Sequence, residues 1–335
     1  MNSPVLRIHQ YSADFTEPVR FLSYVSRSPS FPSLYTRAYF DWKIAGNPFG
    51  PSAAYLRIRD DRAAAHCSIT AKPPNLALIG AVRLAELGDG HTHPDFQRQG
   101  HFGAVGRHTV TECEKAAASG SLIYGLPNSK ALRVWLKSGG CELEPMGVRE
   151  MRLSPLRQPL HRVIGWVARG GATLERADDA AVASEAIDRV WTEAQSAGWL
   201  VGKSAAWWRW RYADATERYV TYLIRVGTVP RGWVVVKRAP SRVPLVHRLT
   251  ICDVVAVASD MEAVGLALIL QTVPRPLDVV TIWTQQDTPL DDAAVRLGFR
   301  PVRDVPVVFA KNATLDSVRT AGRRLRLAIG DTDNV

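Results

Sequence analysis

The fold of this chain is indicated most directly by the stretch Thr92-His93-Pro94-Asp95-Phe96-Gln97-Arg98-Gln99-Gly100-His101-Phe102-Gly103. Its pattern is that of a strand end, a compact turn and a helix that begins at about Phe102. Gly100 allows a positive φ in the turn, and the first N–H groups of the helix point outward with the positive end of the helix dipole behind them. The stretch therefore predicts a site for an extended anion such as a diphosphate.

This turn, together with Leu122-Ile123-Tyr124-Gly125-Leu126-Pro127-Asn128-Ser129 further along, resembles the GNAT family of acyl-CoA N-acyltransferases. The diphosphate loop of that family runs Gln/Arg-x-x-Gly-x-Gly/Ala, and the matching segment here is Gln97-Arg98-Gln99-Gly100-His101-Phe102. Phe102 stands where the family usually has a small residue, and Gly103 follows one place later. The resemblance implies that the chain binds acetyl-CoA as a co-substrate.

Length and composition are those of a folded protein with two cores. The chain has 335 residues, of which 46% are apolar and 22% charged, without a low-complexity segment. Its net charge of 42 − 32 = +10 suits anionic partners such as the phosphates of coenzyme A. No nucleic-acid-binding motif accompanies the basic C-terminal segment around Arg323, so no specific nucleic-acid partner is expected.

The cysteines and the N-terminus favour a cytoplasmic protein without a metal site. Four cysteines are scattered without a C-x-x-C pair, and no matching set of His, Cys and Asp suggests metal ligation. Cys113 fits a helix cysteine that is partly buried better than a nucleophile. The N-terminus lacks the pattern of a secretory signal, and the longest apolar stretch, 263–270, is too short to span a membrane. The sequence leaves the oligomeric state open.

The two halves of the chain resemble each other. The segment Tyr39-Phe40-Asp41-Trp42-Lys43 is echoed by Trp207-Trp208-Arg209-Trp210-Arg211, at a spacing of 207 − 39 = 168. Strand-like segments at 53–59 and 63–69 are likewise echoed at 219–225 and 232–237. The aromatic residues of these helices have the spacing of core packing, although tryptophans around Arg209 would also suit sugar stacking.

We therefore expect an α/β (α+β) fold of two tandem GNAT-like domains, each a central mixed sheet flanked by helices. Residues 1–155 form the acyl-CoA-binding catalytic domain, 156–315 a degenerate copy, and 316–335 a basic C-terminal tail. The join lies in the polar stretch from about Met151 to Leu160.

The second copy lacks the features of a diphosphate site. In place of the glycine turn it has Ala258-Ser259-Asp260-Met261-Glu262-Ala263-Val264-Gly265. Carboxylates at a helix start cap the helix well but repel a diphosphate. The first copy is therefore expected to hold the coenzyme.

In the resembling family two neighbouring strands splay apart, and the coenzyme arm lies in the gap between them. The strands that correspond here are 85–92 and 122–125. Asn128 matches a position that commonly helps to hold the coenzyme, and it also suits the cap of the next helix. The expected coenzyme-binding residues are Thr92, Gln97, Arg98, Gln99, Gly100, His101, Phe102, Gly103 and Asn128.

Transfer to an amine needs a base for the amine proton and donors for the oxyanion. Asp89 is the first candidate for the base and His91 the second, since both lie at the end of the strand that borders the gap, whereas Glu86 points to the other face. The tripeptide Gly88-Asp89-Gly90 would also suit a simple turn. Many relatives have a tyrosine acid where this chain has Trp135, and Tyr124 would replace it only if its side chain faces the gap.

These observations favour an acyl-CoA-dependent N-acyltransferase, with acetyl transfer to a primary amine of a small molecule or peptide by direct attack. No Ser-His-Asp or Cys-His set points to a covalent intermediate. One alternative is a tRNA-dependent aminoacyltransferase like the FemAB peptidoglycan-bridge enzymes, against which the intact diphosphate loop counts. Another is a non-catalytic acyl-CoA-binding protein, which Phe102 and Trp135 would suit.

Overall fold

A computed structural model of the protein describes residues 6–10, 36–59, 62–153, 171–215, 219–239, 246–272, 279–321 and 325–332. The first copy contains β1 (Leu6–Gln10), α2 (Arg37–Phe40) with the π-helical turn Asp41–Ala45, β2 (Ala53–Arg59), β3 (Arg62–Lys72), α3 (Leu76–Ile79), β4 (Arg83–Thr92), the 3-10 turn Pro94–Phe96, α4 (His101–Lys115), β5 (Ser121–Gly125), α5 (Ser129–Lys137) and β6 (Gly140–Arg152). Within the described residues the copy thus alternates strands and helices as the sequence predicts.

The second copy repeats this order. It contains β7 (Ala172–Arg176), α7 (Ala180–Ala194), α8 (Ala205–Trp208) with the π-helical turn Arg209–Ala213, β8 (Tyr219–Val226), β9 (Val229–Ala239), β10 (Arg248–Ala256), α9 (Ser259–Thr272), β11 (Val279–Gln285), α10 (Pro289–Arg296), β12 (Arg300–Ala310), α11 (Ala313–Thr320) and the 3-10 turn Ile329–Asp331. All strands belong to one mixed sheet in the order β1-β2-β3-β4-β5-β12-β6-β11-β10-β9-β8-β7. The expected mixed α/β fold of two tandem copies is confirmed.

The internal repeat is exact at the helix that carries the aromatic residues. Residues 37–45 and 205–213 both form an α-helical turn followed by a π-helical turn, at the constant offset 205 − 37 = 168. Trp42 and Trp210 occupy the same place in the two copies, and their rings stack with centroids 4.9 Å apart. Each indole N–H donates to the other residue's carbonyl, at 2.8 and 3.3 Å. The copies therefore meet across an approximate two-fold axis at this pair.

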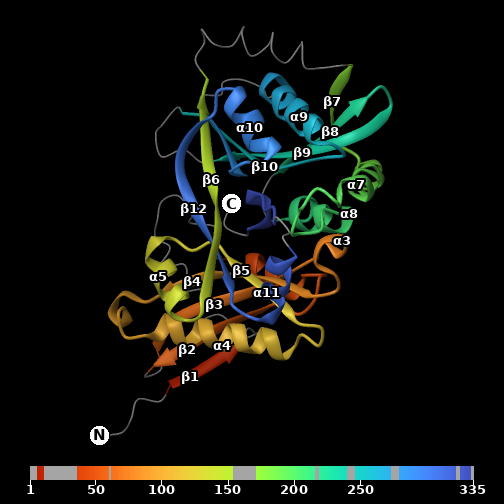
Figure 1. Ribbon diagram of the computed structural model, residues 1–335. Helices are drawn as coiled ribbons and strands as arrows, with labels where there is room; N and C mark the ends of the chain where they lie inside the picture. Colours follow the sequence, from red (N-terminus) through yellow and green to blue (C-terminus); the bar gives the residue numbers. More distant parts are fainter. Residues whose placement is uncertain are drawn as a thin grey trace, which may run out of the picture.

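The two copies exchange strands. β6 belongs to the first copy by sequence, yet both of its neighbours, β11 and β12, come from the second copy. β12 in turn lies between β5 and β6 of the first copy. Figure 1 shows β6 running from the lower half of the molecule into the upper half with β12 alongside it. A boundary at residue 155 therefore does not divide the chain into two self-contained sheets.

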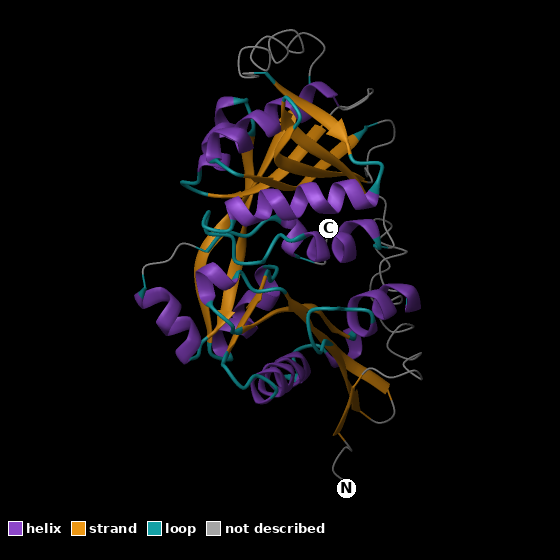
Figure 2. Ribbon diagram, turned by 90° about the vertical axis from the view of Figure 1, so that its right-hand side faces the viewer, coloured by secondary structure: helices purple, strands orange, loops and turns teal. Residues whose placement is uncertain are grey.

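Each half of the sheet is covered on both faces. In the first copy α4 packs on the face of Ala85, Leu87 and Ile123, while the opposite face meets Trp207 and Trp210 of the second copy. In the second copy α9 and α10 cover one face and α7 and α8 the other; Figure 2 shows these strands between helices. The tryptophans around Arg209 are buried, which confirms their prediction as core residues.

The C-terminal stretch expected to be a basic tail is part of the fold over its described residues. It contains most of α11 and the segment 325–332, in which Leu327, Ile329 and Asp331 are buried. The reason is that Ala328 and Ile329 complete the core beneath β10. In the described part of the chain no helix is long and apolar enough to cross a membrane.

The strand exchange predicts that residues 1–155 do not fold by themselves. Expressed alone, this fragment would leave β6 without either neighbour and would expose the edge of β5. We expect it to be unfolded or aggregated, and co-expression with residues 156–335 to recover a soluble, cooperatively unfolding complex, as judged by circular dichroism and thermal melting. An isolated 1–155 fragment that melts cooperatively as a monomer would contradict the exchange.

Candidate functional site

The strand β4 pairs with β5 only over its first four residues, Arg83–Glu86. The parallel register runs from Arg83 opposite Ser121 to Glu86 opposite Tyr124, and beyond this point the strands diverge. A cavity of about 220 Å³ fills the gap. It is lined by Cys67, Leu87, Gly88, Asp89, Gly90, His91, Phe102, Leu126, Pro127, Asn128, Ala131 and Trp135. The chain thus has the splayed pair of strands that the sequence predicts.

A β-bulge at Asp89 bends β4 beside this gap. The register against β3 shifts between His66 and Ser68, and Asp89 has a positive φ of 49°. Its carboxylate accepts hydrogen bonds from Lys43 Nζ at 2.6 Å and from Ser68 Oγ at 2.7 Å. Gly88-Asp89-Gly90 is therefore a bulge inside a continuous strand, and not a turn that ends it.

The Asp89 carboxylate is sealed below the cavity. The residue is 3% exposed, and Lys43 is fully buried. Burial by itself raises the pKa of the Asp89 carboxyl, but the Lys43 ammonium, His66 and the hydrogen bonds from Lys43 and Ser68 outweigh it and hold the pKa below its usual value. Asp89 is thus a buried, ionised and fully engaged group, which is a poor proton acceptor.

His91 differs from Asp89 in its exposure and in its charge at neutral pH. It lies two residues beyond the bulge, is half-buried and lines the cavity. Burial lowers its pKa, and the nearby Asp89 carboxylate opposes this shift only in part. A lowered pKa leaves the imidazole neutral at neutral pH, so that it has a lone pair for a proton. Of the two predicted bases, the geometry therefore favours His91.

His66 lies opposite His91 on β3 and is completely buried. Its Nδ1 is 2.8 Å from the carbonyl oxygen of Asp89, so the imidazole bonds to the bulge itself. Burial lowers the pKa of His66 to about 4, against the attraction of Asp89. A neutral His66 therefore supports the bulge from below.

The predicted diphosphate loop ends in an uncapped helix. Arg98 and Gly100 have positive φ values of 62° and 78°, which turn the chain sharply before α4. Gly100 has no side chain to cap α4, and the first helical hydrogen bond runs from Ala104 N to Gly100 O. The N–H groups of residues 101–103 therefore point beyond the helix start, as an anion site requires.

Positive charge surrounds this helix start. Burial lowers the pKa of His101, and the positive charges of Arg57 and Arg59 on β2 lower it further. Arg59 also donates to the side chain of Gln99, which in turn bonds the carbonyl of Asp95 at 3.0 Å. Neither ring nitrogen of His101 has a hydrogen-bond partner among the described residues, although the side chain is buried. These features suit a bound anion at the N-terminus of α4.

Glycines on the two strands accommodate the two bulky aromatic residues of the gap. A Cβ atom on Gly90 would lie 2.5 Å from the Phe102 ring, and one on Gly125 would lie 2.8 Å from the Trp135 ring. The rings of Phe102 and Trp135 therefore lie directly on the backbones of β4 and β5. Phe102 departs from the family pattern, and the structure makes room for it at Gly90.

Thr92 and Asn128 are predicted coenzyme-binding residues outside the loop, and of the two only Asn128 lines the cavity. Asn128 caps α5, since its Oδ1 accepts the N–H groups of Lys130 and Ala131 at 3.0 Å each. The predicted helix cap is thus confirmed, and Asn128 also lines the cavity. Thr92 ends β4 opposite Ala65 and is half-buried.

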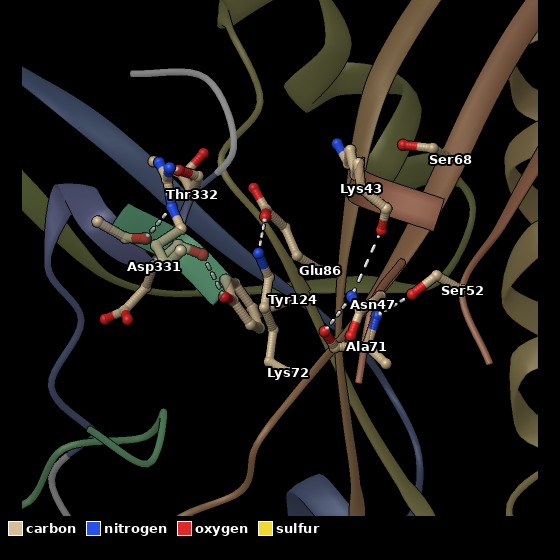
Figure 3. A network of polar contacts seen from close by, with 12 residues as sticks. Lys43, Asn47, Ser52, Ser68, Ala71, Lys72, Glu86, Tyr124, Asp331 and Thr332 are labelled. Atoms are coloured by element: carbon tan, nitrogen blue, oxygen red, sulfur yellow. Dashed lines mark hydrogen bonds and ion pairs between the residues drawn. The ribbon is translucent and has the colours of Figure 1, made fainter. Parts of the chain in front are cut away.

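Tyr124 does not face the cavity. Its hydroxyl donates to the carbonyl of Asp331 at 2.7 Å on the opposite face of the sheet, and the side chain is fully buried (Figure 3). On the same face Lys72 and Glu86 form a buried ion pair of 2.9 Å. Tyr124 therefore cannot replace the missing tyrosine acid, and Glu86 points away from the gap as predicted.

The cysteines near the site are unreactive. Burial raises the pKa of the Cys67 thiol to about 12 and that of Cys113 to about 11. Both remain protonated thiols near neutral pH, so neither is a nucleophile. Within the described ranges no cluster of three or more His, Cys, Asp or Glu residues has the arrangement of a metal site.

In the second copy the equivalent gap is filled by the protein itself. Asp253 corresponds to Asp89, and it accepts hydrogen bonds from Lys203 at 2.8 Å and from Tyr212. Asp331 of the C-terminal segment bonds the same Lys203. A Cβ on Gly330 would meet the Tyr212 hydroxyl and the Asp253 carboxylate, so this segment is packed directly against the Asp253 bulge.

Further contacts close the second gap from both sides. Arg326 pairs with Glu262 at the start of α9 at 2.9 Å, and the N–H of Leu327 bonds Gln285 at the end of β11. Arg149 from β6 forms a buried ion pair with Asp291 in the first turn of α10. Glu262, one of the two carboxylates predicted to repel a diphosphate at this helix start, thus has an arginine of the same chain as its partner.

The structure thus brings Asp89, His91, Phe102 and Asn128 around one cavity, while residues 97–101 form the adjoining loop. Sequence reasoning did not identify Lys43, Ser68 or His66 as parts of the site. Each lies far from Asp89 in the sequence and inside an ordinary helix or strand pattern. The signal that was available is Lys43, a lysine in a turn otherwise rich in aromatic residues.

Comparison with known proteins identifies solved structures that share this fold. No protein-family model matches the chain, and no curated protein matches it by sequence. A probable N-acyltransferase from Enterococcus faecalis superposes with a TM-score of 0.63 at 13% identity, over 94% of this chain and 74% of that one. A GCN5-related N-acetyltransferase from Anabaena variabilis gives 0.61 at 15% identity, over 90% and 72%.

A third similar structure is a tandem GNAT protein from the clavulanic acid biosynthesis pathway. It has a TM-score of 0.58 and 13% identity, and the match covers 91% of this chain and 98% of that one. The chain therefore has the fold of GNAT N-acetyltransferases over nearly its whole described length, arranged as in a tandem protein.

The buried His66 predicts a loss of stability in acid. Its folded pKa of about 4 lies below the unfolded value of about 6.5, so the unfolded chain binds the proton first and the free energy of unfolding falls as the pH drops through this interval. Between pH 7 and pH 5 this group contributes a loss of about 2 kcal/mol. H66N keeps a donor near the Asp89 carbonyl but takes up no proton.

Urea unfolding of both proteins at the two pH values measures the effect. H66N is expected to be less stable at pH 7 and to lose less stability than the native protein on acidification. Equal losses in the two proteins would show that His66 is not the group responsible.

Proposed function

We propose that the protein is an acyl-CoA-dependent N-acyltransferase that uses the first copy to transfer an acyl group, acetyl in the simplest case, to a primary amine. The observation that carries this proposal is the cavity between the diverging ends of β4 and β5, which lies next to the uncapped N-terminus of α4. This combination offers one place for a diphosphate and another for a thioester. The fold shared with acetyltransferases supports the same activity.

The residues around the start of α4 are proposed to bind the coenzyme. The free N–H groups of residues 101–103, with Arg57 and Arg59 nearby, suit the diphosphate of coenzyme A. Residues Thr92, Gln97, Arg98, Gln99, Gly100, His101, Phe102, Gly103 and Asn128 are proposed to contact the coenzyme. The second copy has its own side chains in the corresponding gap, so one coenzyme per chain is expected.

In the proposed reaction the amine nitrogen attacks the thioester carbonyl carbon. The new carbon–nitrogen bond forms, the carbon–sulfur bond breaks, and the sulfur leaves as a thiolate, which is an adequate leaving group without a tyrosine acid. His91 takes the proton that the amine loses. The ionised Asp89 acts through His91, because its charge favours the imidazolium form, while Lys43 and Ser68 hold the bulge. Backbone N–H groups of the bulge suit the role of oxyanion donors.

Calorimetric titration with acetyl-CoA and with free coenzyme A tests binding, and Gly100→Val tests its location. A Cβ atom at Gly100 would meet nothing within 4 Å, yet a β-branched residue resists the positive φ by about 1–2 kcal/mol. We expect the Gly100→Val variant to bind the coenzyme at least about tenfold more weakly than the native protein.

Gly227→Val is the matched control. Gly227 also has a positive φ and open space, but it lies in the turn between β8 and β9 of the second copy. Unchanged affinity in the Gly100 variant would place the diphosphate elsewhere. If the native protein binds neither coenzyme form, the acyl-CoA proposal fails and a tRNA-dependent reaction becomes the better account.

His91→Gln tests the base. We expect kcat to fall by about a hundredfold or more, with little change in KM, because proton removal belongs to the transition state and not to binding. The native enzyme should lose activity as the pH falls through the lowered pKa of His91, and the variant should lose this dependence. His93→Gln, at the neighbouring half-buried histidine, is the control. A normal kcat and pH profile in His91→Gln would exclude it as the base.

A further inference from the structure

A second cavity lies directly behind the first. It has a volume of about 280 Å³ and runs between α4 and α5. Three of its lining residues, Leu87, Phe102 and Trp135, also line the gap between β4 and β5. The two spaces therefore adjoin at the inner end of the gap, where the pairing of the strands ends at Glu86 and Tyr124.

Apolar side chains form much of the wall of this groove. They are Val110 on α4, Val134 on α5 and Ala310 at the end of β12, beside the rings of Phe102 and Trp135. The Arg107 guanidinium lies beside Gly103 and Val134, and Glu114 and Lys311 line the far end. The groove thus offers a largely apolar channel that adjoins the gap and has charged groups at its side and far end.

The helix α5 is not packed as its sequence would allow. It is strongly amphipathic, yet none of its residues is buried, and Val134 and Trp135 are only half-buried. An apolar helix face normally gains its stability by burial against a neighbour. Here that face borders the groove, so an apolar ligand in the groove would cover it.

The wall contributed by α4 is open at a glycine. A Cβ built on Gly106 meets nothing within 4 Å, and the neighbouring Gly103 lines the same groove. A glycine inside a helix costs about 1 kcal/mol relative to alanine. Glycine at position 106 therefore leaves open space beside α4 but makes the helix less stable than alanine would.

We propose that this groove binds the hydrocarbon chain of the acyl group, so that the preferred donor is a medium-chain acyl-CoA and not acetyl-CoA. The inference rests on the proposed function. A coenzyme arm that enters from the start of α4 and follows β4 brings the thioester to the Asp89 bulge beside His91, and an acyl group longer than acetyl would extend from there past Leu87 into the mouth of the groove. The bonds formed and broken in the transfer are unchanged, since the chain only extends the acyl carbon.

The apolar part of the groove sets the chain length. From Phe102 to Val110 the helix rises by about 12 Å. Carbon–carbon bonds of about 1.5 Å advance an extended chain by about 1.3 Å each, so this distance holds a chain of roughly eight to ten carbons. Beyond it, charged residues at the far end of the groove disfavour further methylene groups.

The test is calorimetric titration of the full chain with free coenzyme A and with its acetyl, butanoyl, hexanoyl, octanoyl and palmitoyl thioesters. Each buried methylene is worth up to about fourfold in affinity, so octanoyl-CoA should bind at least tenfold more tightly than acetyl-CoA, with no further gain for palmitoyl-CoA. If acetyl-CoA binds and longer chains bind no better, the groove inference fails while the proposed function stands. If no coenzyme form binds, the proposed function fails first.

Gly106→Leu locates the effect by filling the groove. The ratio of octanoyl-CoA to acetyl-CoA affinity should fall to about one, because the leucine occupies the space of the chain. Ala116→Leu adds the same side chain at the exposed end of α4, outside the groove, and should preserve the native ratio. An unchanged ratio in Gly106→Leu would overturn the proposal. An equal loss for free coenzyme A and all thioesters would overturn it too, since the groove would then hold the coenzyme arm.

Discussion

The pairing of β6 with β12 is the constraint on which the rest of the molecule depends. Both neighbours of β6 come from the second copy, and both neighbours of β12 come from the first. The exchange leaves no sheet edge at the junction, so the two copies form one continuous sheet. It also fixes the position of β5, whose divergence from β4 opens the candidate site.

The two copies meet the same physical problem with different residues. Each bends its central strand at an aspartate whose buried carboxylate needs a cation, because an unpaired charge there would cost several kcal/mol. Lys43 serves Asp89 from the π-helical turn, whereas Lys203 serves Asp253 from the segment before α8. In the first copy the space beyond the bulge remains open. In the second it is occupied by the C-terminal segment, which shares Lys203 through Asp331.

The open copy is shaped by pairs of glycine and aromatic residues. Phe102 lies on Gly90 and Trp135 lies on Gly125, so each large ring takes the place of a side chain on the strand. The two rings divide the space under α4 and α5 into the gap and the groove. Phe102 and Trp135, which differ from the residues expected from the family resemblance, thus determine the shape of this site.

The sequence by itself determined the local structure and the repeat. The glycine turn before α4, the cap at Asn128 and the aromatic helix repeated at an offset of 168 residues all follow from short-range patterns, because backbone conformation and hydrogen bonding act over a few residues. The mixed fold and the burial of the tryptophans follow from the same periodicities. These signals need no knowledge of which segments meet in space.

Only the tertiary structure decided how the copies share strands and which groups surround Asp89. Lys43 and Ser68 bond the Asp89 carboxylate, and His66 bonds the Asp89 carbonyl. Because of these contacts the structure favours His91 as the candidate base, whereas the sequence alone favours Asp89. The filling of the second gap by residues 325–332 likewise depends on contacts between distant segments. Burial and charge pairing arise from such long-range contacts, and a pattern along the chain does not encode which partners they bring together.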